Sequence, residues 1–257
     1  NQRRQDMLKE ERFKIIMKQI NLHNKVLSVD LSKLLNVSED TIRRDLKELA
    51  DGGHIVRVHG GAISKSLVRP FIADVNVYSL EEKRIIAAKA VKLIENNMTL
   101  LFEGGTTIFE LTKVIPENLN LTIFTISPQI AISLSECKNI KVFTIGGELK
   151  KDHNIHVGAH TINELHRIRF DLCFMGVNAI SVERGMTDID MEVVEVNKAM
   201  FEVSEKNVLL TIAEKLNLSQ RHQVSDLSDI DFLITELDCN NPFLDGFRNQ
   251  YSHINIH

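Results

Sequence analysis

Basic and hydroxyl side chains gather on one short stretch of the chain, where together they could bind a polyanion. On a helix that begins after the N-cap residue Ser38, apolar residues spaced by four and three share one face and turn toward a core. Arginine can then make paired hydrogen bonds to guanine, and lysine or threonine can reach bases or phosphates. The apolar residues are Ile42, Leu46 and Leu49, and the polar residues on the far or flanking side are Thr41, Arg43, Arg44 and Lys47.

A charged helix face is more often simply solvated than bound to a polyanion. The neighbouring elements therefore decide whether this face is solvated or binds DNA. The pattern predicts helices over 4–22, 28–35 and 38–51, with a tight turn between the second and third. Residues 54–63 favour a strand pair with a Gly-Gly turn, and its Arg57 and His59 could contact the DNA backbone. A short helix, a basic third helix and a trailing ribbon together favour a winged helix-turn-helix that reads DNA.

A second candidate site is the run LLFEGGTTIFEL, residues 100–111, in which an expected strand leads into an expected helix. Gly104 and Gly105 let backbone N–H groups approach an anion, and Thr106 and Thr107 add hydroxyls where the helix begins. On physical grounds alone a plain tight turn explains the pattern about as well.

Short apolar runs alternate with helical stretches after Leu80, which predicts a parallel α/β sheet covered on both faces. The expected strands are 98–102, 121–126, 140–145, 171–175, 208–212 and 232–235, and the expected helices are 81–95, 106–114, 129–136, 159–167 and 192–205. We therefore expect a DNA-binding domain over 1–63, a linker over 64–79, an effector-sensing domain over 80–240 and a tail over 241–257.

The charge distribution agrees with this division. The net charge of the 257 residues is −4, but residues 1–65 carry +4 and the remainder carries −8. A basic module on an acidic body is what a DNA reader joined to a sensor would show. No apolar run approaches the length of a membrane span, so no membrane partner is expected.

Cysteine usage and the first residues indicate the compartment. Three widely separated cysteines predict a reducing cytoplasm without a disulfide framework, and Cys173 in an apolar strand predicts a buried, inert thiol. Residues 1–11 are too polar for a secretory leader. Because the chain starts at Asn1 rather than Met, we expect a longer natural N-terminus.

The string VSEDTIRRDLKELADGGHIVRVHGGA, residues 37–62, resembles the signature of the DeoR family of bacterial transcriptional regulators. The resemblance implies a winged helix-turn-helix, double-stranded operator DNA as partner, and a homodimer or homotetramer reading repeated half-sites. It also implies a C-terminal domain similar to the sugar-phosphate isomerase and CoA-transferase-like fold, which binds a small effector such as a sugar phosphate. The chain would then be a repressor of a carbohydrate operon, without a cofactor.

The resemblance assigns effector-binding positions along the second domain, all at or near expected strand ends, where open α/β sheets bind ligands. The turn after residue 102 is similar to the family's Asp-x-Gly-Thr-Thr turn, with Glu103 in place of Asp. The other implied positions are Ser127, Gly146, Gly147, Glu148, Gly176 and Lys215.

The chain departs from the family pattern at four places. Ile126 stands for a usual Asn, Asp188, Ile189 and Asp190 for a typical Thr-Pro-Asn, Asn197 for a frequent Lys, and Ile212 for the Asp of an Asp-x-x-Lys motif. Polar or cationic contacts are thereby lost or reversed in sign, and an added Asp would repel a phosphate. We expect an effector that differs from the commonest sugar phosphates, for example one with less charge, or a degenerate pocket.

Three alternatives remain open on the sequence. The chain could be an isomerase-like enzyme, in which Glu103 and Lys215 would be the acid/base candidates, although an isomerase needs no DNA reader. It could be an architectural DNA-binding protein without an effector. A metal site at His153, His156 and His160 is a weaker possibility, because no Cys or paired acids join them.

Overall fold

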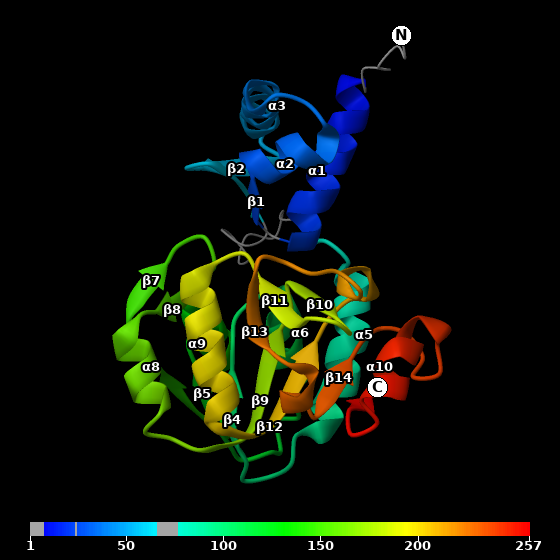
Figure 1. The fold of residues 1–257 in the computed structure, drawn as a ribbon. Helices are drawn as coiled ribbons and strands as arrows, with labels where there is room; N and C mark the ends of the chain where they lie inside the picture. Colours follow the sequence, from blue (N-terminus) through cyan, green and yellow to red (C-terminus); the bar gives the residue numbers. More distant parts are fainter. Residues whose placement is uncertain (1–7, 24, 66–76) are drawn as a thin grey trace. The chain divides into compact units, whose positions relative to one another are not determined.

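Apolar residues at helical spacing organise the first part of the chain into three helices and a small antiparallel sheet. The computed structural model describes residues 8–23, 25–65 and 77–257, and the chain divides into two units, Asn1–Tyr78 and Ser79–His257 (Figure 1). The first unit contains α1 (Lys9–His23), β1 (Lys25–Leu27), α2 (Ser28–Leu35), α3 (Glu39–Asp51), β2 (Ile55–Val58) and β3 (Gly61–Ser64). The three expected helices are therefore present; positions 4–7 of the first prediction lie outside the described residues.

The expected apolar face of α3 forms the centre of this unit. Ile42, Leu46 and Leu49 are at most 4% exposed, and they pack in one cluster with Ile16 of α1 and Leu31 of α2. Burying such side chains contributes about 1.5–3 kcal/mol each. The packing leaves the opposite face of α3 to solvent.

The strand pair at 54–63 is a hairpin, and a third strand that the sequence does not predict joins it. β3 lies between β1 and β2, antiparallel to both. β1 has only three residues, too few to show a period. Gly61 permits the pairing, because a Cβ there would lie 1.9 Å from the carbonyl oxygen of Val26. Gly60 supplies the turn with φ 75°, a conformation that glycine adopts without strain.

A charged pair fixes α1 against α3. Arg12 Nε donates to Asp45 Oδ2 at 2.8 Å and Arg12 Nη2 donates to Asp45 Oδ1 at 3.0 Å, in a two-pronged contact. The two side chains are only 14% and 5% exposed. Hydrogen bonding to the carboxylate raises the pKa of the Arg12 guanidinium, so the pair stays ionised.

The second unit is built on a parallel sheet of seven strands, in the order β15-β14-β12-β9-β4-β5-β6. The strands are β4 (Thr99–Phe102), β5 (Leu121–Thr125), β6 (Ile140–Thr144), β9 (Phe170–Gly176), β12 (Ser204–Leu210), β14 (Phe232–Ile234) and β15 (Asn255–Ile256). Six of them match expected strands, and the expected parallel α/β class is confirmed.

Helices cover this sheet on both sides. α5, α6 and α7 pack in succession and α8 packs on α9; in Figure 1, α9 crosses in front of the sheet while α6 lies behind it. The helices are α5 (Leu80–Ala90), α6 (Thr106–Thr112), α7 (Pro128–Leu134), α8 (Ala159–Leu165), α9 (Met191–Glu202) and α10 (Asp245–Gln250). Short antiparallel strands that the sequence does not predict lie beside them: β7 (Glu148–Lys150), β8 (Ile155–Val157), β10 (Ala179–Ser181), β11 (Gly185–Asp188) and β13 (His222–Ser225).

The prediction that residues 241–257 form a tail outside the sensor domain is wrong. They form α10 and β15, and β15 pairs in parallel with β14 at the edge of the sheet. Phe247 is fully buried and Ile254 is 7% exposed, so hydrophobic burial holds the segment in place. The strand of two residues is too short to show a pattern. Of the expected linker at 64–79, residues 66–76 lie outside the described residues.

We expect Asp45→Ala to destabilise the first unit by about 3–5 kcal/mol, because the variant removes one member of a charged pair whose side chains are 14% and 5% exposed. Urea unfolding followed by circular dichroism measures the loss. Asp51→Ala removes an exposed carboxylate from the same helix and should change stability by no more than about 0.5 kcal/mol. Equal midpoints for the two variants would contradict the structural role of the pair.

Candidate functional site

The exposed face of α3 carries the basic side chains that the sequence predicts as DNA contacts. Arg43 Nη2 lies 3.4 Å from Glu39 Oε2, and Arg44 Nη2 lies 2.7 Å from Asp40 Oδ2. Both pairs join residues four apart at exposed positions, where an ion pair contributes little. Lys47 is exposed as well. The two guanidinium groups are therefore held only by contacts that a phosphate or base can replace.

Ser38 and Thr41 have a structural role at the start of α3. The backbone N–H of Thr41 donates to Ser38 Oγ at 3.1 Å, which makes Ser38 the N-cap that the sequence predicts. The two hydroxyl oxygens lie 2.9 Å apart and share a hydrogen bond. Contact of either residue with DNA stays a prediction.

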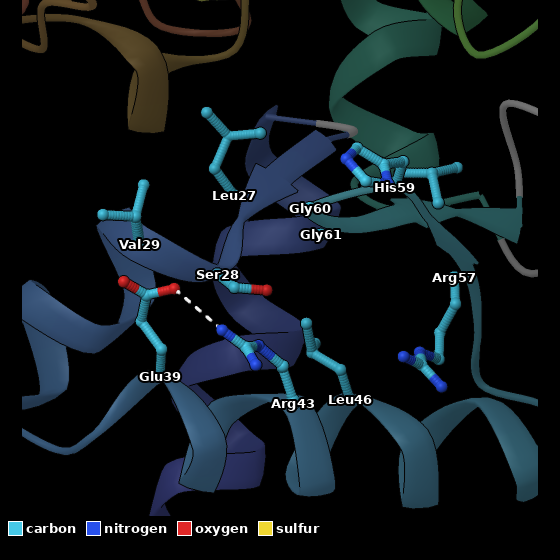
Figure 2. A pocket seen from close by; sticks show the side chains of 11 residues that line it. Leu27, Ser28, Val29, Glu39, Arg43, Leu46, Arg57, His59, Gly60 and Gly61 are labelled. Atoms are coloured by element: carbon cyan, nitrogen blue, oxygen red, sulfur yellow. Dashed lines mark hydrogen bonds and ion pairs between the residues drawn. The ribbon is translucent and has the colours of Figure 1, made fainter.

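The structure brings Arg43, Arg57 and His59 to one hollow between α3 and the hairpin. The hollow has a volume of about 620 Å³, and Figure 2 shows Arg43 entering it from α3 and Arg57 from β2. Arg57 and His59 are exposed. Three groups that can bind a phosphate thus come from two separate elements, which is the arrangement that a strand of DNA backbone needs. The other predicted contacts, Arg44 and Lys47, do not line the hollow.

The start of α2 forms a third wall of this hollow, which the sequence analysis missed. The backbone N–H of Ser28 donates to the carbonyl oxygen of Gly60 at 2.8 Å, so the helix start and the hairpin turn are joined. No side chain in the described part of the chain caps this end of α2. Glu39 was also missed, although its spacing of four residues from Arg43 indicates the pair.

In the second unit, the ends of neighbouring parallel strands meet at Glu103, directly after β4. Glu103 Oε2 accepts a hydrogen bond from the N–H of Gly176, at the end of β9, at 2.8 Å. Glu103 Oε1 accepts one from Asn197 Nδ2 of α9 at 3.3 Å. The hydroxyl of Thr125, at the end of β5, donates to the carbonyl oxygen of Glu103 at 3.2 Å. The end of β9 and α9 therefore hold the carboxylate of Glu103, and the end of β5 holds its backbone carbonyl.

The glycine turn after Glu103 has the geometry that the sequence predicts. Gly105 is the residue before α6 with φ 90°. Among the described residues, a Cβ there would meet no atom within 4 Å, and no side chain caps the helix. Gly104 is crowded, because a Cβ there would lie 2.6 Å from Ile155 Cγ2. Thr106 and Thr107 begin the helix and are partly exposed. The turn therefore presents an open, glycine-lined face.

Two lysines belong to the same unit, and one of them, Lys215, interacts electrostatically with the Glu103 carboxylate. Lys215 Nζ donates to the carbonyl oxygen of Val177, just after β9, at 2.8 Å. Lys83 of α5 is 6% exposed, and its charge acts on that of Lys215. The sequence analysis missed Lys83, although it occupies the apolar stripe of its helix with Ile86, Ala87 and Ala90. A lysine at such a position is a signal of a buried charge.

Burial shifts the pKa values of these three groups toward neutrality. Desolvation raises the pKa of Glu103 to about 7, opposed by the hydrogen bonds from Gly176 and Asn197 and assisted by the charge of Asp188. Desolvation lowers the pKa of Lys83 to about 7, with a further contribution from Lys215. It lowers the pKa of Lys215 to about 8, although Asp188 and Glu103 oppose the shift. The cluster thus becomes more positive as pH falls through 8 and 7.

The four departures from the family pattern divide into two kinds. Ile126 is fully buried and Ile212 is 3% exposed, so both are core residues. Asp188 Oδ1 accepts hydrogen bonds from the N–H groups of Ile189 and Asp190, at 2.6 and 3.0 Å. The fourth departure, Asn197, donates a hydrogen bond to the carboxylate of Glu103. The two polar departures therefore add acceptors and an acid beside the glycine turn.

The remaining predicted positions are only partly joined to this cluster. The N–H of Ser127 donates to Thr125 Oγ1 at 3.0 Å, which brings it next to the turn. Thr161 Oγ1 donates to the carbonyl oxygen of Gly146 at 2.9 Å, which ties the Gly146-Gly147 loop to α8. Glu148 is exposed in β7, and no described contact joins it to Glu103.

The predicted histidine trio does not form a cluster of possible metal ligands. Among the described residues, the group whose ligand atoms lie within 4.8 Å of one another is Asp152, His153 and Asp190. Lys150 Nζ lies 3.0 Å from Asp190 Oδ2, so a metal ion would have to displace an ammonium group. Cys173 is buried and burial raises the pKa of its thiol, as an inert cysteine requires.

Comparison with known proteins identifies the family. Residues 12–67 match the DeoR-like helix-turn-helix domain, and residues 79–237 match the DeoR C terminal sensor domain. The chain belongs to the DeoR family. It is a DNA-binding transcriptional regulator in which a helix-turn-helix domain precedes an α/β sensor domain, as the sequence predicts.

Relatives of this DeoR-family chain are similar along most of their length. It is 30% identical over 242 residues to a putative aga operon transcriptional repressor of Escherichia coli O157:H7, covering 93% of this chain and 90% of the relative. It is 30% identical over 231 residues to a glycerol-3-phosphate regulon repressor of Haemophilus influenzae, covering 85% and 90%. A solved structure of ribose 5 phosphate isomerase A from Neisseria gonorrhoeae is similar at 19% identity, with 55% of each chain covered and a TM-score of 0.41. No helix among the described residues is long and apolar enough to cross a membrane.

We expect the stability of the wild type to fall relative to Glu103→Gln as pH rises from about 4.5 to about 7. The raised pKa means that the folded state binds the Glu103 proton more tightly than the unfolded state, and this contribution is lost as the carboxyl ionises. Thermal unfolding of both chains across this pH range measures the difference. Glu95→Gln, at an exposed position, is the control and should follow the wild type. Parallel curves for wild type and Glu103→Gln would rule out the shift.

Proposed function

We propose that this DeoR-family regulator represses a carbohydrate operon by placing α3 in the major groove of double-stranded operator DNA. The observation that carries the proposal is the hollow between α3 and the hairpin, which Arg43, Arg57 and His59 line (Figure 2). A DNA strand in this hollow would give its phosphates to Arg57 and His59. Ser38, Thr41, Arg44 and Lys47 would contact bases or phosphates along the exposed side of α3.

The two named relatives support the regulatory role. One is named as a repressor of an operon and the other as a repressor of a glycerol-3-phosphate regulon. We infer that this chain likewise acts as a repressor, in the cytoplasm where its operator lies. The chain would assemble as a homodimer or homotetramer, because two half-sites need two reading heads at a matched spacing.

We propose that a small carbohydrate metabolite, related to the sugar phosphates but with less negative charge, binds at the glycine turn after Glu103. The open face of Gly105, with Thr106 and Thr107, would hold its anionic or polar end. Lys215, and the loops at Ser127, Gly146, Gly147, Glu148 and Gly176, would complete the pocket. Binding would change the spacing of the reading heads in the oligomer and so the affinity for the operator.

The carboxyl groups near this turn favour an effector with less negative charge than a phosphate monoester. Glu103 and Asp188 interact electrostatically with Lys215 and with each other. A dianion at this place would therefore be repelled by two carboxylates. Asn197 Oδ1 is buried and accepts no hydrogen bond from the described residues, which suits a hydroxyl donor from a sugar.

We propose that the chain is not an enzyme, although the pKa of Glu103 near 7 would suit a general base. The carboxylate of Glu103 and the ammonium of Lys215 are both engaged by structural hydrogen bonds. Incubating the full chain with aldose and ketose phosphates tests this directly. Turnover that is lost in Glu103→Gln would establish the isomerase alternative.

We expect Arg43→Ala and Arg44→Ala each to weaken operator binding about tenfold to a hundredfold, because each removes a contact to a base or phosphate. An electrophoretic mobility assay on an operator duplex, selected from random DNA with the wild-type chain, measures the loss. Unfolding curves should stay unchanged, since both side chains are exposed. Lys92→Ala removes one positive charge from the exposed surface of the sensor unit and should leave binding intact. Wild-type affinity in either arginine variant would refute its assignment.

Thermal stabilisation by a panel of free and phosphorylated sugars, at pH 6 and pH 8, tests the effector. We expect a free or weakly charged sugar to stabilise the chain similarly at both pH values. An anionic effector should bind more tightly at pH 6, where Lys83 and Lys215 are charged and Glu103 is largely neutral. Stabilisation by an ordinary sugar phosphate at micromolar concentration would overturn the low-charge assignment.

A further inference from the structure

One acidic side chain is present among the described residues that line the hollow between α3 and the hairpin. Glu39, the first residue of α3, lines this hollow together with Arg43, Arg57 and His59. Phosphates repel a carboxylate, so an acid in a surface that binds DNA needs a contact that compensates for the repulsion. The proposed function gives Glu39 no role, and its place in the hollow therefore calls for one.

The carboxylate of Glu39 is accessible and has capacity for a further hydrogen bond. Its Oε2 accepts one from Arg43 Nη2 at 3.4 Å, and the two side chains are 47% and 60% exposed. Figure 2 shows the carboxylate turned toward the guanidinium group. In the described part of the chain, the other oxygen, Oε1, accepts no hydrogen bond. A donor on a ligand that enters the hollow can therefore reach this carboxylate.

Glu39 and Arg43 lie on the same side of the helix that we propose enters the major groove, because residues four apart share a face. The N-terminal residues of such a helix are the ones that contact base edges. In the major groove, guanine presents two acceptors, N7 and O6, and cytosine presents the N4 amino donor. A guanidinium group therefore suits guanine and a carboxylate suits cytosine, so the two side chains complement the two bases of one pair.

The separation of the two charged groups also fits a single G·C pair. Guanine O6 and cytosine N4 are hydrogen-bonded to each other in the pair, so they lie about 2.9 Å apart. Two protein groups that contact these atoms side by side need a similar separation. Arg43 Nη2 and Glu39 Oε2 are 3.4 Å apart. The two side chains can thus contact both bases while they remain next to each other.

We propose that Glu39 determines operator specificity by accepting a hydrogen bond from the N4 amino group of a cytosine, while Arg43 donates to the guanine paired with that cytosine. The inference rests on the proposed function, because it requires α3 in the major groove. Adenine also carries an amino group, but its partner thymine has no N7 for the second hydrogen bond of Arg43. A G·C pair is therefore the one that satisfies both side chains.

Asp40 is a matched control for Glu39. It is also an exposed acid in the first turn of α3, and its Oδ2 lies 2.7 Å from Nη2 of Arg44, four residues later. Neither Asp40 nor Arg44 lines the hollow. Glu39→Ala and Asp40→Ala each remove one negative charge and one acid that stabilises the start of the helix. An effect on binding that the two variants share therefore reports charge or helix stability, and a difference between them reports the hollow.

Affinities of the full chain for duplexes that differ at one base pair test the proposal. The parent duplex is the one selected from random DNA with the wild-type chain. We expect replacement of one G·C pair in the half-site by A·T to weaken wild-type binding about a hundredfold, since two contacts are lost. The same replacement should weaken binding of Glu39→Ala only about tenfold, because Arg43 remains. Asp40→Ala should discriminate between the two duplexes as the wild type does.

Two modified bases in this G·C pair distinguish the contact of Glu39 from that of Arg43. N4-methylcytosine still pairs with guanine, but a methyl group replaces the amino hydrogen that Glu39 would accept. Its counterpart, 7-deazaguanine, lacks the N7 acceptor that Arg43 would use. We expect the methyl group to weaken wild-type binding about tenfold and to leave binding of Glu39→Ala unchanged. The deazaguanine should weaken binding of both chains, because Glu39→Ala retains Arg43.

An equal effect of N4-methylcytosine on the wild type and Glu39→Ala would overturn the inference, because Glu39 would then only hold Arg43 in place. Undiminished discrimination between the two duplexes by Glu39→Ala would overturn it as well. In either case, weaker operator binding by Arg43→Ala would leave the proposed function intact. A wild-type chain that selects no sequence from random DNA would overturn the proposed function, and this inference with it.

Discussion

The contact between Arg12 and Asp45 determines what the reading helix can present. It is a charged pair at the interface of α1 and α3, and it holds the two helices in one rotational setting. Replacement by apolar residues could stabilise the unit equally well, since buried pairs contribute little net energy. What the pair adds is orientation, because its two-pronged geometry is satisfied in one arrangement only. With Asp45 turned inward, Arg43, Arg44 and Lys47 of α3 are turned outward.

The sensor unit uses charge differently. Its acids and lysines lie where the parallel strands end, and each is held by backbone groups: Glu103 by Gly176, Asp188 by the two residues after it, and Lys215 by Val177. Burial raises the pKa of Glu103 to about 7 and lowers the pKa of Lys215 to about 8. The charge of Glu103 and Lys215 therefore changes at pH values near 7 and 8.

Most of the fold could be predicted from the sequence because its signals are local. The stripe of Ile42, Leu46 and Leu49 predicts α3, and the apolar runs predict the central strands. The short strands β1, β7 and β15 could not be predicted, because two or three residues show no period. The partners of β1 and β15 are also distant in the chain. The prediction of a tail over 241–257 was wrong for a similar reason, because only tertiary packing, which the local sequence does not show, places Phe247 in a core.

The candidate sites were predicted less completely. Residues within a motif, such as Arg43 and Gly105, could be identified from spacing, whereas partners from other elements could not. Asn197 reaches Glu103 across 94 residues, and Ser28 reaches Gly60 across a whole helix pair. Lys83 is an exception, since its place in an apolar stripe already indicates burial. Sequence patterns thus identify the residues of a site that belong to one motif more readily than the partners that other elements contribute.

The link between Ser28 and Gly60 has a consequence for how the hollow in the first unit can respond. β3 is bonded to β1 on one side and β2 on the other, and the next residue after β1 begins α2. The start of α2 and the hairpin that carries Arg57 and His59 therefore share one hydrogen-bonded framework, and we expect these walls of the hollow to move together. In the proposed complex with DNA, the adjustment would fall to the nucleic acid, so that sequences whose backbone already has the right curvature would be favoured at positions no side chain touches.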